Sequence, residues 1–409
     1  MFSFEASLIL RRLLDATFIV LAFSALAFGQ VSEREWDELF QREQGWLGAD
    51  GVYSLDLSFN AETNAKADVN VSPGVLFWFS DTFVGTTKNQ GQEYENRTMV
   101  NHSFAILDGF DPNPRKIEFF CSPPNQANAG NIIEGHYWLQ DGIALNDKLW
   151  ISAILVGKAW KPDRVDAVAI QLDPRTRRPD FSKISVDDSA PLSLKEKDAQ
   201  LVWGAGVLDD AKDEYVYVYG YVDRFRQGSR KDLVVARVKR TRFQEYQEWE
   251  YYDGNKWSSD PKIAFHPRST LVRNVSTEFS VSRIPQGIHK GKYLLVYTPG
   301  VIGNDLAFRI AESPVGPFSD ERAFYRSKIQ EKLPDVKCYN AKAHPIFTND
   351  DGFLVSYNVN RLGDLARTPE EYRPRFVRLS WDEINARSFS QNRSGSSQEE
   401  TERKNEERD

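Results

Sequence analysis

Residues 75–85 read VLFWFSDTFVG, and stretches of the same apolar, β-branched and aromatic kind return four more times along the chain. The later copies are KLWISAILVG (148–157), YVYVYGYVD (215–223), KYLLVYTPG (292–300) and FLVSYNVN (353–360). Short runs of this composition, bounded by turn residues, are typical of buried β-strands. The repeated stretch therefore predicts an all-β protein.

Each copy is flanked by two further strand-like segments, so the chain repeats a three-strand unit. Preceding strands are predicted at 50–58, 137–145, 201–208, 278–284 and 341–347, and following strands at 99–107, 166–173, 232–239, 305–312 and 373–381. Repeated antiparallel sheets are the sequence signature of a β-propeller, in which each sheet is a blade around a central channel. We therefore predict a five-bladed β-propeller over residues 45–387. The alternative, a many-stranded β-sandwich, explains the alternation within strands but not the repeat.

The two ends of the chain differ from this body. Residues 1–29 combine Arg11 and Arg12 with a short apolar run and small residues before Gln30, which predicts a cleaved signal peptide and a secreted or periplasmic protein. An uncleaved anchor is the alternative. Residues 30–44 are expected to hold one short helix capped by Ser32. Residues 388–409 lack apolar periodicity and are expected to form a disordered tail.

Composition excludes several classes of function. The chain has 409 residues, with 52 Lys and Arg against 59 Asp and Glu, so no basic surplus exists to neutralise nucleic-acid phosphates. It also lacks a Cys/His cluster with zinc spacing, a G-x-S-x-G elbow and a phosphate-binding loop. Cys121 and Cys338 are available for one disulfide. We expect a monomer with neither a nucleic-acid partner nor a membrane association after signal cleavage.

The first strand of each blade is innermost in a propeller, so its polar residues line the channel. The five predicted first strands contribute, in order, Asp50, Asp141, Trp203, Glu278 and His344. Several carboxylates converging on one channel resist joint ionisation, which favours a role in binding or catalysis. Asp81 joins this set because it follows the apolar run 75–79, where a carboxylate is out of place unless it faces the channel.

Paired carboxylates are the machinery of glycoside hydrolysis: one protonates the leaving oxygen, and the other acts as nucleophile or activates water. Asp50, Asp81, Glu278 and Asp141 are therefore the catalytic candidates. For Asp50-Gly51 and Asp141-Gly142, a hydrogen-bonding role in a turn explains the residues equally well.

Three quoted segments carry a resemblance to a known family. GWLGADGVYSLDLS (45–58), LFWFSDTFVG (76–85) and MVNHSFAIL (99–107) resemble the opening blade of a bacterial family of secreted five-bladed propellers, formerly named domains of unknown function, with a related branch that contains endo-D-arabinanases. ESPVGPF (312–318) and YNAKAHPIFTNDDGFLVSYNVN (339–360) agree with it, and ESPVGPF also occurs in arabinanase/xylosidase-like propellers.

The resemblance covers about residues 45–381 and implies a secreted glycoside hydrolase with Asp50 and Asp81 as its catalytic carboxylates. A Glu on a later blade is the general acid in arabinanase/xylosidase-like propellers, which keeps Glu278 among the candidates. The sequence departs from the family pattern at Ser80, where Gly is common, and in a longer polar hairpin at 60–72. Specificity for D-arabinan is therefore not carried over.

Residues beside the inner strands are the candidates for substrate binding: Asn101, Trp138, Trp203, Tyr339, Asn340 and His344. The aromatic members can stack on sugar faces, although packing between blades accounts for each of them as well. The resemblance implies a second role for His344, in holding a structural Ca²⁺ at the propeller axis, while packing or a backbone hydrogen bond is the alternative. We expect that catalysis requires no cofactor.

Two other functions remain open at this point. One is a carbohydrate-binding or surface-scaffold propeller without turnover. The other is a phosphorolytic enzyme, which would need a basic cluster at the channel, where the sequence offers only the scattered Arg97, Arg224, Arg309 and Arg361.

Overall fold

The computed structural model describes residues 33–60, 65–66, 74–122, 130–210, 212–228, 230–361 and 366–386. The predicted signal peptide (1–29), the predicted tail (388–409) and most of the hairpin at 60–72 lie outside these residues. No helix in the described part is long and apolar enough to cross a bilayer. All elements named below belong to the unit that begins at Glu33.

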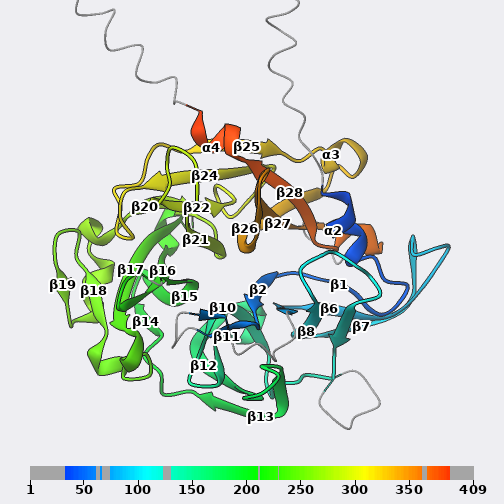
Figure 1. Ribbon diagram of the computed structural model, residues 1–409, viewed down its shortest axis with the longest axis horizontal. Coiled ribbons are helices and arrows are strands. Elements are labelled where there is room, and N and C mark those ends of the chain that lie inside the picture. Colours follow the sequence, from blue (N-terminus) through cyan, green and yellow to red (C-terminus); the bar gives the residue numbers. More distant parts are fainter. Residues whose placement is uncertain are drawn as a thin grey trace, which may run out of the picture. The chain divides into compact units, whose positions relative to one another are not determined.

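The described strands form five sheets of four or more strands, which confirms the all-β class (Figure 1). The first sheet has the order β2 (Tyr53–Asp56), β5 (Gly74–Phe79), β8 (Ser103–Asp108) and β9 (Ile117–Phe120). The second has the order β10 (Tyr137–Leu145), β11 (Lys148–Val156), β12 (Pro162–Leu172) and β13 (Pro179–Asp187).

The third sheet is the largest. Its order is β14 (Ser193–Glu196), β15 (Ala199–Asp209), β16 (Tyr215–Arg224), β17 (Arg230–Lys239), β18 (Glu250–Tyr252) and β19 (Trp257–Ser258), and β17 also pairs with β20 (Val272–Val275). The fourth sheet is β21 (Phe279–Arg283), β22 (Tyr293–Tyr297), β24 (Asp305–Ala311) and β25 (Arg322–Arg326). The fifth is β23 (Ile302–Gly303), β26 (Val336–Asn349), β27 (Gly352–Arg361) and β28 (Arg375–Ser380).

Smaller elements complete the described fold. A three-stranded sheet joins β1 (Gln44–Ala49), β6 (Thr82–Lys88) and β7 (Glu93–Val100), and β3 (Phe59–Asn60) pairs with β4 (Ala65–Lys66). The α-helices are α2 (Arg34–Leu39), α3 (Ile329–Lys332) and α4 (Trp381–Asn385). The predicted cap Ser32 lies outside the described residues; the helix begins after Glu33, whose side chain makes no capping hydrogen bond. Cys121 and Cys338 are both free thiols.

The five predicted first strands correspond to β2, β10, β15, β21 and β26, and they face a common centre in Figure 1. Each contacts the next in sequence order, and β26 contacts β2. A hydrogen bond of 2.7 Å between Ser54 Oγ on β2 and His344 Nδ1 on β26 joins the two strands. The inner strands therefore follow one another in a ring of contacts.

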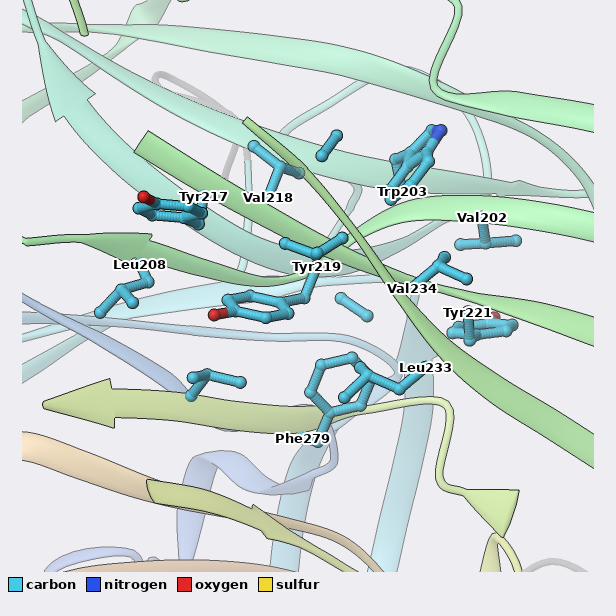
Figure 2. Close-up of a cluster of buried hydrophobic side chains, with 14 of the residues drawn as sticks. Val202, Trp203, Leu208, Tyr217, Val218, Tyr219, Tyr221, Leu233, Val234 and Phe279 are labelled. Carbon is cyan, nitrogen blue, oxygen red and sulfur yellow. The ribbon is translucent and has the colours of Figure 1, made fainter. Parts of the chain in front are cut away.

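Aromatic side chains of the second strands fill the space between neighbouring sheets. Tyr219 and Tyr221 of β16 lie in one buried cluster with Trp203 of β15 and Phe279 of β21 (Figure 2). Gly206 is needed in this cluster, since a Cβ atom there would lie 3.1 Å from the Phe279 ring. The high aromatic content of the chain thus serves mainly the contacts between sheets.

Helix α2 packs where the first and last sheets meet. The Phe40 ring lies 5.4 Å from Phe376 of β28 and 5.6 Å from Phe77 of β5, and Trp36 lies 4.3 Å from Phe347 of β26, all measured between ring centroids. The backbone amide of Phe376 also donates a 2.8 Å hydrogen bond to the Asp37 carboxylate. The beginning and the end of the described chain are therefore held together by one aromatic cluster.

Two of the predicted strands are interrupted, which corrects their expected course. The stretch 75–85 is divided at Ser80-Asp81 into β5 and β6, and 99–107 is divided at Asn101-His102 into β7 and β8. The chain between β1 and β2 breaks at the same level, at Asp50 and Gly51. Gly51 has φ +65°, and a Cβ atom at this position would lie 2.8 Å from Ser80 Oγ. Three neighbouring strands therefore bend together, with two acidic residues at the bend.

Candidate active site

The bend in the first sheet places Asp50 beside Asp81. Ala49 pairs with Thr82 across β1 and β6. Beyond that pair, the Asp50 amide donates to the Asp81 carbonyl at 3.3 Å, and the Ser80 amide donates to the Asp50 carbonyl at 2.9 Å. Both acids therefore leave adjacent antiparallel segments at the same level, and both line one cavity of about 890 Å³.

Five aromatic side chains form part of the walls of this cavity. Phe83, Trp138, Trp160, Tyr339 and Tyr372 line it together with the two acids, and Lys337 and Arg361 are its basic residues. Arg361 is ion-paired with Glu371 and Asp335. Carbon-rich walls with a few fixed polar groups are typical of sites that bind small organic molecules.

Asp50 is partly exposed toward the cavity and enclosed by protein on its other sides. The Tyr339 hydroxyl donates a 2.9 Å hydrogen bond to its Oδ2 atom. Burial raises the pKa of the Asp50 carboxyl well above its usual value, and the nearby negative charges of Asp81 and Glu278 raise it further. The hydroxyls of Tyr339 and Tyr372 oppose this shift but do not reverse it. Asp50 is therefore better suited than an ordinary aspartate to hold a proton.

Asp81 has different neighbours, and only 8% of it is exposed. The Trp138 indole N–H donates to Oδ2 at 3.0 Å. His136 Nε2 lies 3.3 Å from Oδ1, within ion-pair distance but not aligned as a hydrogen bond. The Tyr372 hydroxyl donates to the Asp81 carbonyl at 3.2 Å, which fixes the backbone at the bend. The carboxylate of Asp81 is thus positioned as an acceptor by two aromatic rings from β10 and the loop before it.

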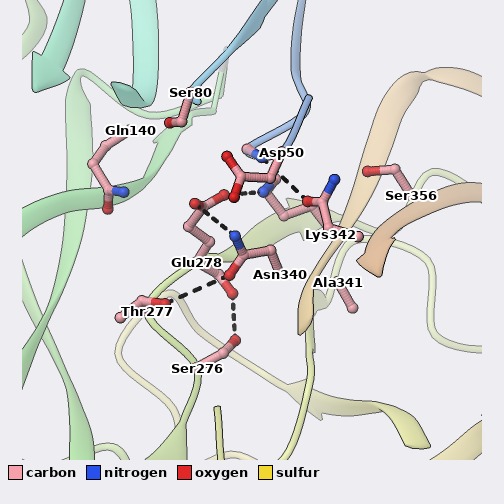
Figure 3. A network of polar contacts seen from close by, with 12 residues as sticks. Asp50, Ser80, Gln140, Ser276, Thr277, Glu278, Asn340, Ala341, Lys342 and Ser356 are labelled. Atoms are coloured by element: carbon pink, nitrogen blue, oxygen red, sulfur yellow. Dashed lines mark hydrogen bonds and ion pairs between the residues drawn. The ribbon is translucent and has the colours of Figure 1, made fainter. Parts of the chain in front are cut away.

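Glu278 does not line the cavity but lies in a polar network near Asp50 (Figure 3). Asn340 Nδ2 donates to its Oε1 at 2.8 Å, and Lys342 Nζ forms a buried ion pair with Oε2. The Lys342 ammonium also lies 4.2 Å from the centre of the Tyr53 ring. Because both its oxygens are engaged, Glu278 acts on Asp50 through its charge rather than by contact with a ligand.

Asp141 lies within β10, at a bulge in its pairing with β11. Its oxygens accept from the amide of Gly142 at 2.9 Å and from the amide of Val207 on β15 at 2.7 Å. Burial raises its pKa to about 7. It lines a second, narrower cavity of about 310 Å³ that is bounded by the inner strands and also includes Lys342 and His344. Asp141 therefore connects two inner strands and does not share the cavity of Asp50 and Asp81.

His344 lies deep in the second cavity, with both ring nitrogens engaged. Nδ1 is 2.7 Å from Ser54 Oγ, and Nε2 is 2.8 Å from Ser356 Oγ. Burial, together with the charge of Lys342, lowers the pKa of the ring to about 3. Among the described residues, no three His, Cys, Asp or Glu side chains are grouped so that they could hold a metal ion. The ring of His344 is thus held in place by two serine hydroxyls.

The other predicted binding residues are dispersed. Trp138 and Tyr339 line the cavity and bond to its two acids. Asn340 is buried against Glu278, and Asn101 at the bend donates to the Gly135 carbonyl at 3.3 Å. Trp203 is fully buried among the hydrophobic side chains between sheets and lines neither cavity.

Four residues of the site were not among the sequence-based candidates: His136, Trp160, Lys342 and Tyr372. His136 comes directly before a predicted strand, and Lys342 lies inside the quoted NAKAHP segment, so both were within reach of sequence analysis. Tyr372 lies in the irregular segment before β28, and Trp160 ends the 3₁₀ turn Lys158–Trp160. Neither position carries a periodic pattern that would direct a side chain toward the axis.

Comparisons with known proteins agree with this fold. A family described as "Domain of unknown function (DUF5005)" matches residues 33–382. No curated protein matches the chain. A solved structure from Bacteroides ovatus ATCC 8483, provisionally described as a hydrolase, is 18% identical with a TM-score of 0.63 and covers 86% of this chain and 91% of its own. At that identity the likeness concerns the fold alone.

Two more distant structures are glycoside hydrolases. A thermostable family-43 glycoside hydrolase is 11% identical, with a TM-score of 0.38 and coverage of 81% of this chain and 88% of its own. A β-xylosidase/α-arabinofuranosidase from a compost microbial metagenome, solved with xylotriose, is 12% identical, with a TM-score of 0.39 and coverage of 78% and 87%.

Proposed function

We propose that this chain, which belongs to the DUF5005 family, is a glycoside hydrolase that uses Asp50 and Asp81 as its acid pair. One observation carries the proposal: two carboxyl groups from adjacent strands face the same aromatic-lined cavity and have unlike surroundings. A pair of carboxyl groups in different environments divides the roles of acid and base between them.

Asp50 is the proposed general acid. Burial and the charges of Asp81 and Glu278 raise its pKa, so that it keeps its proton to a higher pH than an ordinary aspartate does. In the proposed reaction this proton moves to the glycosidic oxygen as the bond between that oxygen and the anomeric carbon breaks. The sugar released on that side leaves as an alcohol, and Asp50 is left as a carboxylate.

Asp81 is the proposed partner on the other side of the anomeric carbon. Its Oδ2 accepts from Trp138, and its Oδ1 is buried beside His136, so the position of the carboxylate is fixed at both oxygens. In an inverting reaction the Asp81 carboxylate takes a proton from the attacking water; in a retaining reaction it bonds to the anomeric carbon and water later releases the sugar. Proton NMR of the first-formed product distinguishes the two routes by its anomeric configuration.

The proposal extends to the architecture and the location of the protein. We propose that the five sheets form a closed five-bladed propeller, because the inner strands contact one another in a ring and α2 packs between the first and last sheets. We propose that residues 1–29 direct export, and N-terminal sequencing of the mature protein tests whether cleavage occurs before Gln30.

We propose that the reaction needs no metal or other cofactor, because the described residues offer no ligand cluster and both His344 nitrogens are bonded to serine hydroxyls. Dialysis against EDTA should leave activity unchanged. A loss of activity that Ca²⁺ restores would contradict this part of the proposal.

The central test is a screen of arabino-, xylo- and galacto-configured polysaccharides with the purified protein and three variants. Asp50→Asn and Asp81→Asn should each lower turnover by at least a hundredfold while the melting temperature stays within a few degrees. Asp350→Asn, in an exposed turn, is the matched control and should behave as wild type. Sugar binding without product release from the unmodified protein would instead favour a carbohydrate-binding propeller.

A further inference from the structure

Large apolar side chains are exposed at the rim of the cavity. Five such residues are exposed in the described part of the chain, and two of them, Trp160 (55%) and Ile302 (51%), line the cavity of Asp50 and Asp81. Single exposed apolar residues are common on protein surfaces, whereas apolar residues grouped at one concavity mark a binding site. The other three exposed residues are Val186, Phe225 and Ile288, and none of them lines this cavity.

The backbone that presents both residues is strained. Trp160 has φ +59°, and Val301, directly before Ile302, has φ +76°. The left-handed region is uncommon for any residue with a side chain and is an outlier for a β-branched one such as Val301. Such conformations persist only where the surrounding structure imposes them, and they concentrate at functional sites. Left-handed backbone therefore occurs at or directly beside both exposed rim residues.

Each rim residue neighbours a residue that adjoins one of the two acids. The Trp160 ring lies 5.0 Å from that of His136 at an interplanar angle of 88°, and His136 adjoins Asp81. Ile302 pairs with Tyr339 across β23 and β26, and the Tyr339 hydroxyl bonds to Asp50.

The two residues also come from different sheets. Trp160 follows β11 in the second sheet, while Ile302 belongs to the fifth, and the first sheet, which carries both acids, neighbours each of these in the ring of inner strands. The acid pair thus has an exposed apolar side chain on either side.

We propose that Trp160 and Ile302 form two sugar-binding subsites that flank the acid pair, so that the cavity holds an internal stretch of a glycan chain. This inference rests on the proposed glycoside hydrolase function. The C–H faces of sugar rings are apolar, and covering an exposed indole or aliphatic side chain with such a face removes apolar surface from water. The cavity of about 890 Å³ is within the range of pockets that enclose ligands of several rings.

The test measures binding separately from turnover. Asp50→Asn is used to stop the reaction, and calorimetry follows arabino-, xylo- and galacto-oligosaccharides of one to six units. In the series that binds best, affinity should rise at least tenfold between one and four units. Adding Trp160→Ala or Ile302→Ser should remove about tenfold of affinity for four units and little for one unit. Phe225→Ala and Ile288→Ser are the matched controls, since both residues are exposed and apolar but lie away from the cavity.

A second readout uses the active protein. An enzyme with subsites on both sides of the acid pair cuts inside the chain, so the first products of a polysaccharide digest should span several lengths. Release of single sugars alone would overturn the inference, as would affinity that does not depend on length or rim variants that match the controls. If no glycan is hydrolysed but length-dependent binding is lost in Trp160→Ala, the hydrolase proposal fails and the subsites stand. If the panel is neither bound nor cut, both fail.

Discussion

The pKa of Asp141 shows how strongly the second cavity, which is bounded by the inner strands, disfavours a charged carboxyl group. Its pKa is raised from 3.8 to about 7, mainly by burial, although two backbone amides and Lys342 act in the opposite direction. The informative change is Asp141→Asn, because the amide keeps the size of the side chain and removes its titration. The predicted effect is on the free energy of unfolding and on how that energy depends on pH.

The sign follows from proton linkage. A carboxyl group whose pKa is higher in the folded than in the unfolded state binds more protons when folded, so it lowers stability as the pH rises between the two values. For Asp141 the loss begins near pH 4 and is complete just above pH 7. One pKa unit corresponds to about 1.4 kcal/mol, so the interval from pH 4.5 to 7.5 contains about 3 kcal/mol. Over this pH interval the unfolding free energy of wild type should therefore fall by that amount relative to that of Asp141→Asn.

Urea unfolding followed by tryptophan fluorescence at several pH values between 4.5 and 7.5 measures this difference, with Asp350→Asn as the exposed control. The variant also loses one acceptor for a backbone amide, but that loss is the same at every pH and does not affect the slope. The reasoning would be refuted if the difference in unfolding free energy between variant and wild type does not change with pH, or if the variant becomes relatively less stable as the pH rises. Such a result would show that the hydrogen bonds from the amides of Val207 and Gly142 lower the pKa of Asp141 by more than burial raises it.

Three further predictions concern contacts around the site and the fold. His136→Ala should lower kcat by about tenfold with little change in KM, because the ring that adjoins the Asp81 carboxylate is lost. Steady-state kinetics measures this effect, and an unchanged kcat would show that His136 takes no part in the site. Lys342→Met should destabilise the protein by about 3–5 kcal/mol in urea unfolding, because Glu278 is left buried without its cationic partner. The double variant Lys342→Met with Glu278→Gln should recover most of this loss, and an absence of recovery would contradict the ion-pair explanation. Phe40→Ala should cost about 3–5 kcal/mol by opening the aromatic cluster between the first and last sheets, whereas Phe225→Ala at the surface should change stability by less than about 0.5 kcal/mol; equal effects would argue against the role given to α2.

The strand order could be predicted because it depends on local pattern. The expected strands at 137–145 and 353–360 correspond closely to β10 and β27, since alternating or continuous apolar runs determine which segments pair. The interruptions at Ser80-Asp81 and Asn101-His102 could not be read in the same way. They depend on hydrogen bonds between strands distant in sequence, such as the one from the Ser80 amide to the Asp50 carbonyl.

The site could be predicted only in part, because local pattern determines some of its features and contacts between residues distant in sequence determine the others. Sequence position identifies which residues lie near the inner strands but not which way each side chain points. Trp203 lies on an inner strand yet packs between sheets, while Lys342, on another inner strand, ends beside Glu278. A buried lysine next to a buried glutamate is costly unless the two are paired, and that pairing joins residues 64 positions apart.

The clearest signal for the acid pair was a conflict between a residue and its surroundings. Asp81 follows six fully buried residues of β5, a position where local preference calls for an apolar side chain. The fold accommodates it by bending the strand, and the same bend exposes Asp50 to the cavity on the neighbouring segment. Replacing both acids by apolar residues should therefore improve stability while abolishing activity, since the cost of burying two neighbouring carboxyl groups would no longer be incurred. If Asp50→Leu combined with Asp81→Leu unfolds at a lower temperature than wild type, the carboxyl groups are needed to form the bend itself, and their role is structural before it is chemical.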